Sequence, residues 1–101
     1  MIKVIKILNI DKFNITCLFN NGLVKIIEVE PLLLNHKHLK GIEKLLKQET
    51  FNLAKIGSFG EILWEKIIST EYNGQVEIWD YDISPELIMA IGKSNKLNTA
   101  V

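Results

Sequence analysis

The sequence predicts one α+β domain, in which an antiparallel sheet of two meanders, with five to six strands, packs against two helices. Three observations support this fold class. Asn-Gly pairs mark tight hairpin turns at residues 21–22 and 73–74, strand-like alternation flanks both pairs, and helical patterns follow at residues 39–49 and 85–91. A chain of 101 residues has room for one core. We therefore expect residues 1–92 to form a single domain and residues 93–101 to form a flexible C-terminal tail.

The first meander is predicted within the first thirty residues. Residues 2–10 are rich in Ile and Val, which favours a strand, and residues 9–12 give a polar turn. Residues 13–19 then alternate as a half-buried strand. The apolar side chains of one parity in this strand are Phe13, Ile15, Cys17 and Phe19. Asn21-Gly22 turns the chain, and residues 23–29 return as the third strand.

A proline and an amphipathic pattern define the middle of the chain. Pro31 cannot donate to a strand ladder, so the third strand ends at about Glu30, and residues 32–34 form a turn or a short helical piece. Apolar residues at helical spacing then predict a helix of about three turns over residues 39–49. Gly41 weakens this helix by roughly 1 kcal/mol relative to Ala. One other face carries a stripe of lysines, namely Lys37, Lys40, Lys44 and Lys47.

The second meander begins with a short strand over residues 51–56, closed by a turn at residues 57–60. The next strand starts at Glu61 and runs to Trp64, or on as far as Thr70. After the Asn-Gly turn, residues 75–81 return as the last strand.

Three successive residues predict the start of the final helix. Ser84 is a favourable N-cap, Pro85 suits the first helical position, and Glu86 complements the helix dipole. Gly92 is well placed to end this helix.

Composition limits the class of protein. The hydrophobic fraction of 48% and the charged fraction of 24% are typical of a folded soluble chain. No run approaches the roughly 20 apolar residues that span a bilayer, and lysines interrupt the first apolar residues, unlike a signal peptide. The single Cys17 fits a reducing compartment. We therefore expect a cytoplasmic protein without membrane contact.

Charge is distributed unevenly along the chain. Residues 1–60 carry nine lysines against five acids, whereas residues 61–86 carry one lysine against seven acids. The chain contains no arginine, so it lacks the bidentate contacts that dominate specific nucleic-acid recognition. Nucleic-acid binding is therefore disfavoured as a main function.

The order of these signals resembles the bacterial domain-of-unknown-function family 2442. The residues that carry the resemblance are Phe19-Asn20-Asn21-Gly22, Val29-Glu30-Pro31-Leu32-Leu33, Phe51, Gly60-Glu61-Ile62-Leu63-Trp64 and Asp82-Ile83-Ser84-Pro85-Glu86-Leu87. The family passes almost directly from its Trp to the closing motif, whereas this chain inserts residues 65–75. The resemblance implies a small α+β domain with an accessory or regulatory role, antitoxin-like or beside a partner protein, and supplies no catalytic residues.

The residues able to carry chemistry do not combine into a recognisable site. Cys17 has no local base to activate it and is expected to be a buried, inert thiol. His36 and His38 could hold a transition metal, but a third ligand is missing nearby and the adjacent lysines repel a cation. The carboxylates Asp80, Asp82 and Glu86, with Ser84, lack the glycine of a calcium loop and are explained by helix capping and solubility. We predict no catalytic residue, cofactor or metal site.

The function predicted from these features is a small non-enzymatic protein-interaction or regulatory module. Its partner is a small protein or a second copy of the chain, which would dimerise through the edge of its sheet or through the second hairpin. The lysine stripe and the acidic segment have complementary charge, which favours such docking. The aromatic residues Trp64, Tyr72, Trp79 and Tyr81 are interface anchors if exposed and core residues if buried. The alternative function is a small-ligand or metal-binding domain that uses His36, His38 and the carboxylates near Asp80.

Overall fold

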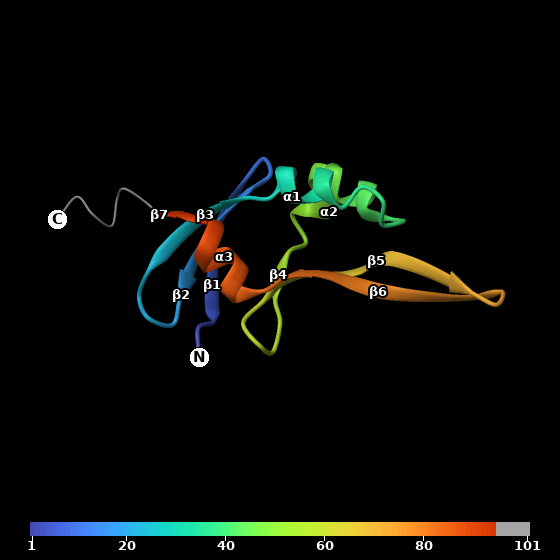
Figure 1. Cartoon of the computed structure of the whole chain (residues 1–101). Helices are drawn as coiled ribbons and strands as arrows, with labels where there is room; N and C mark the ends of the chain where they lie inside the picture. The colour runs from blue at the N-terminus through green and yellow to red at the C-terminus, as the bar shows by residue number, and fades with distance from the viewer. Residues whose placement is uncertain (95–101) are drawn as a thin grey trace.

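The computed structural model describes residues 1–94 and shows an α+β fold with two antiparallel sheets and three α-helices in that part of the chain (Figure 1). The first sheet has four strands in the order β1-β2-β3-β7, and the second has three in the order β4-β5-β6. The predicted fold class is confirmed. The finer prediction is only partly right, because the strands divide between two sheets and exceed the predicted five to six.

The first meander forms as the sequence predicts. Its strands are β1 (Val4–Asp11), β2 (Asn14–Phe19) and β3 (Val24–Glu28). Gly22 takes a φ of 88° in the tight turn between β2 and β3, a conformation that favours glycine. A short strand, β7 (Lys93–Ser94), pairs with β3. The predicted tail therefore begins with two paired residues, and its remainder, residues 95–101, lies outside the described residues.

The segment after β3 agrees with the prediction at its start, where α1 is the expected short helical piece, and differs from it further on. It forms α1 (Glu30–Asn35), a 3₁₀ helix η1 (Ile42–Leu46) and a short α2 (Gln48–Phe51). The predicted continuous helix over residues 39–49 is wrong, because Gly41 has a φ of 103° and Lys47 is extended. Phe51 ends α2, so the strand predicted over residues 51–56 shrinks to β4 (Lys55–Ile56).

The second Asn-Gly pair joins the two longest strands. These are β5 (Ile62–Tyr72) and β6 (Gln75–Ile83), both longer than the sequence predicts. Asn73 and Gly74 have φ values of 51° and 79°, as the predicted tight turn requires. The β5–β6 hairpin extends away from the first sheet (Figure 1).

The final helix, α3 (Pro85–Ile91), begins at the predicted residues. The side-chain oxygen of Ser84 accepts a hydrogen bond of 3.1 Å from the backbone N–H of Leu87. This contact is the predicted N-cap. The backbone N–H of Gly92 donates to the carbonyl of Ile88 at 2.8 Å, where the helix ends.

One hydrophobic core connects both sheets and the helices. Its largest fully buried side chains are Trp64, Phe19, Phe51, Ile15, Ile27, Leu33, Leu45, Ile62 and Ile88. The sheets also meet through the backbone, because the N–H of Val4 donates to the carbonyl of Gly60 at 3.0 Å. The molecule is nevertheless elongated, at 57 × 27 × 20 Å. No helix within residues 1–94 has the length and apolarity needed to cross a bilayer.

Candidate functional site

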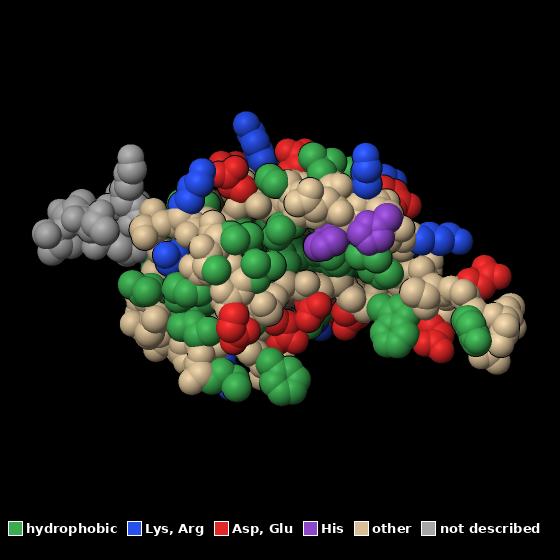
Figure 2. Space-filling view, in the orientation of Figure 1, with side chains coloured by type: hydrophobic (Ala, Val, Ile, Leu, Met, Phe, Trp, Pro, Cys, Tyr) green, Lys and Arg blue, Asp and Glu red, His purple; other side chains and the backbone are tan. Residues whose placement is uncertain are grey.

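The far half of the β5–β6 hairpin carries four exposed large apolar side chains. We call residues 69–80 the arm. Every residue of β6 from Gln75 to Asp80 is exposed. The exposed large apolar side chains of the arm are Tyr72 (79%), Val76 (61%), Ile78 (54%) and Trp79 (52%). Figure 2 shows hydrophobic side chains standing out from this end of the molecule, with acidic side chains beside them.

The strand register assigns these side chains to two faces of the arm. Ser69 lies opposite Ile78 and Glu71 opposite Val76, so Val76 and Ile78 share one face. Thr70 lies opposite Glu77 on the other face, which also carries Trp79. Both faces therefore expose apolar side chains, and neither is covered by a helix in the way that the base of the hairpin is covered by the core.

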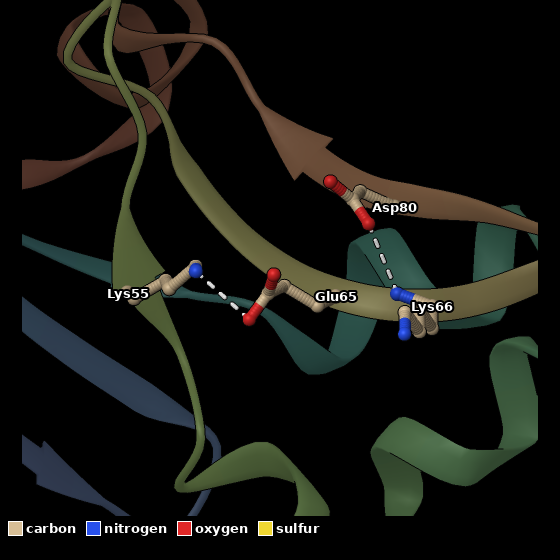
Figure 3. A network of polar contacts seen from close by, with 4 residues as sticks. All are labelled: Lys55, Glu65, Lys66 and Asp80. Atoms are coloured by element: carbon tan, nitrogen blue, oxygen red, sulfur yellow. Dashed lines mark hydrogen bonds and ion pairs between the residues drawn. The ribbon is translucent and has the colours of Figure 1, made fainter.

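A bulge separates the buried base of the hairpin from the arm. The pairing jumps from Trp64 with Tyr81 to Ile68 with Trp79, so three residues of β5 lie opposite Asp80 alone. Within the bulge, Lys66 has a φ of 55°, and its backbone N–H donates to Oδ1 of Asp80 at 3.0 Å (Figure 3). Asp80 therefore fixes the backbone of the bulge.

A neighbouring ion pair ties β4 to the start of the bulge. Nζ of Lys55 lies 2.8 Å from Oε1 of Glu65 (Figure 3). Both side chains are more than half exposed, so this pair contributes little to stability. Its position nevertheless shows that the bulge contacts β4 as well as β6.

Two of the four aromatic residues considered as interface anchors are core residues. Trp64 is 1% exposed and Tyr81 is 6% exposed. The indole N–H of Trp64 donates to the carbonyl of Phe51 at 2.8 Å, and the ring lies against those of Phe51 and Tyr81. Trp64 and Tyr81 are therefore not accessible to a partner. Tyr72 and Trp79 are exposed, so both stay candidates for interface anchors.

The candidate histidines are used within the fold. Nδ1 of His36 lies 2.8 Å from the hydroxyl of Tyr81, within hydrogen-bond distance. The ring of His38 stands edge-on to that of His36, with centroids 6.2 Å apart. Burial, with a smaller contribution from Asp82, raises the pKa of Tyr81, so its hydroxyl stays protonated at neutral pH. Within residues 1–94, no group of three or more His, Cys, Asp or Glu side chains could share a metal ion.

The four lysines do not form the predicted helical stripe. Lys37 and Lys40 lie in the turns before η1, Lys44 lies within η1, and Lys47 follows it. All four are exposed, and no ion pair joins any of them to a carboxylate in the described part of the chain. The carbonyl of Lys40 accepts a hydrogen bond of 3.0 Å from the N–H of Ser69, so this turn lies beside the start of the arm.

The remaining candidates for chemistry are Cys17 and the side chains that line two cavities. Cys17 is fully buried, as expected, and burial raises the pKa of its thiol to about 11, which disfavours the reactive thiolate. Cavities of about 220 and 250 Å³ lie beside Trp64 and beside Pro85. The first is lined by Thr50, Leu53, Trp64, Glu65 and Ile67, and the second includes Glu61, Asp82 and Glu86. Neither lining holds a nucleophile paired with a histidine base.

Sequence reasoning missed two residues of the arm surface, Val76 and Ile78. Their alternation with Glu77 and Trp79 correctly predicted a strand. The same alternation places apolar groups on both faces of that strand, a pattern that is also typical of a strand buried on both faces, so no local signal marked these residues as exposed.

Comparisons with known proteins add no relative from which a site can be transferred. No protein-family model, no curated protein and no solved structure matches this chain. The functional inference therefore rests on the residues of this chain.

Proposed function

We propose that the chain is a small non-enzymatic protein-interaction module that docks on a protein partner through the arm. The observation that carries this proposal is the exposure of Tyr72, Val76, Ile78 and Trp79 on one projecting two-stranded element. Exposed aromatic and aliphatic side chains gathered on a projecting element are typical of protein interfaces.

The architecture of the arm supports this proposal. A two-stranded hairpin is at best marginally stable in water by itself, and a further strand or a packed face is usually needed. The base of this hairpin has such support from Trp64 and Tyr81. Beyond Ser69, whose N–H reaches the carbonyl of Lys40, the described part of the chain supports the arm only by the pairing of its own two strands. A protein partner would supply the missing contacts.

The charge of the arm narrows the kind of partner. Glu71, Glu77 and Asp80 are its only charged residues, so the arm is acidic. An anionic membrane surface or a nucleic-acid backbone would repel it. A protein surface that offers an apolar strand edge suits it better.

We propose a regulatory or accessory role for this interaction, with a cytoplasmic location. The resemblance to the domain-of-unknown-function family 2442 points the same way, because it implies an accessory protein that is antitoxin-like or acts beside a partner. The arm begins inside the insertion that distinguishes this chain from that family's pattern, residues 65–75, and shares residues 69–75 with it. We infer that partner choice belongs to the hairpin that this insertion extends.

The test is arm-dependent co-purification from the host. The tagged chain is expressed at native level beside an untagged copy, and proteins that co-elute are quantified by mass spectrometry. The arm variant is Ile78→Lys, because a charge on a strand edge opposes pairing. The control is Leu53→Lys, which places the same charge at a 71% exposed apolar residue outside the arm.

The proposal predicts a stoichiometric protein that the wild type and Leu53→Lys retain and that Ile78→Lys loses. This protein is either the untagged copy or another chain. Equal recovery with all three proteins, or no stoichiometric protein with any of them, would contradict the arm as a docking element.

A further inference from the structure

We propose that the arm pairs with the arm of a second copy of this chain. The two β6 strands would run antiparallel around a two-fold axis at Ile78 and join the two β4-β5-β6 sheets into one six-stranded sheet. This inference rests on the proposed function and names its partner. It follows from three features of the β6 edge.

The first feature is that β6 is an unprotected edge. Within residues 1–94, β6 pairs only with β5, so alternate residues of Gln75–Asp80 direct their backbone N–H and C=O groups away from the sheet. Natural edges are usually blunted by Lys, Pro or a bulge. Residues 75–80 contain no Lys or Pro, only the acids Glu77 and Asp80, and the bulge of the hairpin lies at Asp80, so that the pairing from Gln75 to Trp79 is regular.

The second feature is the contrast with the edge strand of the other sheet. The ladder of β1 has two register shifts, and Lys3 and Lys6 lie at its start. The backbone N–H of Val4 is already used by the carbonyl of Gly60. The β1 edge is thus protected in several ways, whereas the β6 edge keeps backbone groups free to pair.

The third feature is that the β6 edge is complementary to itself. A register centred on Ile78 pairs the exposed run 76–80 with its own copy. Glu77 then faces Trp79, and Val76 faces Asp80, so no like charges lie directly opposite. A register centred on Glu77 would oppose two carboxylates, and one centred on Trp79 would extend pairing to the buried Tyr81 and Ile83.

The register centred on Ile78 also makes the exposed aliphatic groups continuous. Val76 and Ile78 share one face, so two copies would place four aliphatic side chains in adjacent positions there. The ladder would add a third and fourth strand to each arm, which is the support that a two-stranded element lacks.

Association by this route has a distinctive salt dependence. Each arm carries Glu71, Glu77 and Asp80 and no cation, so two paired arms repel each other at long range. Added salt screens this repulsion, and the dimer should tighten as ionic strength rises. Docking of the arm on the lysines of a second copy would instead weaken with salt.

The experiment combines sedimentation equilibrium with disulfide cross-linking of the purified full chain. Ile78→Cys places two thiols on the two-fold axis, where opposed strand residues lie about 4.5–5.5 Å apart, within disulfide reach. Val76→Cys is the matched control, because it replaces a similarly exposed aliphatic residue on the same face. Its two copies would be four residues out of register, roughly 13 Å apart and beyond reach. Wild type, whose Cys17 is buried, gives the background.

The expected result is a mass of twice 11.6 kDa that becomes more populated with salt. Ile78→Cys should give at least about five-fold more covalent dimer than Val76→Cys under mild oxidation. A monomer at all concentrations, a dimer that weakens with salt, or equal cross-linking of the two variants would overturn the pairing. A monomer whose arm still retains another protein in the co-purification would overturn this inference alone. Failure of both experiments would overturn the proposed function as well.

Discussion

At the residue scale, Trp64 and Trp79 lie on the same hairpin in opposite environments. Trp64 is 1% exposed and donates its indole N–H to the carbonyl of Phe51, whereas Trp79 is 52% exposed and donates to Oγ1 of Thr70 at 2.9 Å. The bulge between them moves the hairpin out of the core. Nothing in either residue's local sequence distinguishes the two, because the bulge depends on Lys66 and Asp80, which meet only in three dimensions.

The two tryptophans should respond oppositely to truncation. Trp64→Ala removes a buried ring and leaves the carbonyl of Phe51 without its partner, so it should lower the free energy of unfolding by about 3–5 kcal/mol. Trp79→Ala should change that free energy by less than about 1 kcal/mol and weaken association. Denaturant unfolding measures the first effect and sedimentation the second. An unfolded Trp79→Ala variant would show that Trp79 is structural and would contradict its role at an interface.

The buried Cys17 should make stability depend on alkaline pH. Its pKa rises from the usual 9.0 to about 11 in the folded chain, so the stabilisation is present in full below pH 9. This stabilisation is then lost as pH rises toward the pKa of the thiol in the folded chain, and the total loss is roughly 2–3 kcal/mol.

The measurement is the difference in unfolding free energy between wild type and Cys17→Ala across this pH range. All other titratable groups are common to both proteins, so their contributions to the difference cancel. The difference should be constant near neutral pH and shift against the wild type above about pH 9. A difference that stays constant throughout would show that the thiol is not desolvated.

At the element scale, the segment between α1 and β4 shows where sequence periodicity misleads. The apolar spacing of residues 39–49 suits a helix, and Ile42 and Leu45 are indeed buried. The chain there is nevertheless a turn, a 3₁₀ helix and a break, because Gly41 takes a left-handed φ beside the backbone of Ile67. The two Asn-Gly turns and the helix start at Ser84-Pro85 were predictable, because their own residues specify them. The segment between α1 and β4 was not predictable, because it depends on a contact between residues 26 positions apart.

Gly41→Ala tests this account by the sign of its effect. In a regular helix the substitution would stabilise the protein by about 1 kcal/mol. In the observed structure a Cβ at Gly41 would collide with the carbonyl oxygen of Ile67, so we expect destabilisation by at least about 2 kcal/mol. Gly22→Ala is the matched control, with a positive φ but nothing within 4 Å of the added Cβ, and should cost only about 1–2 kcal/mol. Thermal or denaturant unfolding measures the loss of stability in both variants. A loss at Gly41 that is equal to or smaller than the loss at Gly22 would contradict this account.

At the scale of the whole molecule, the chain is a packed body with one projecting arm. The body satisfies its polar groups, since no buried side-chain N or O atom of the described residues lacks a hydrogen-bond partner. The arm, in contrast, has a free strand edge and apolar groups on both faces. Turn signals, periodicity and chain length predicted one α+β domain, but not that part of it would stand apart. That arrangement depends on how the two sheets divide the strands.

The most direct test of the account is hydrogen exchange of the β6 edge as a function of protein concentration. Pairing of two arms would bury alternate backbone N–H groups of residues 75–80, so their exchange should slow as the dimer forms. Residues 14–19 in β2, which has neighbours on both sides, serve as the internal control and should not change. If exchange of the N–H groups of residues 75–80 that face away from β5 stays fast across the concentration range, the account is contradicted, because the arm edge would then remain uncovered.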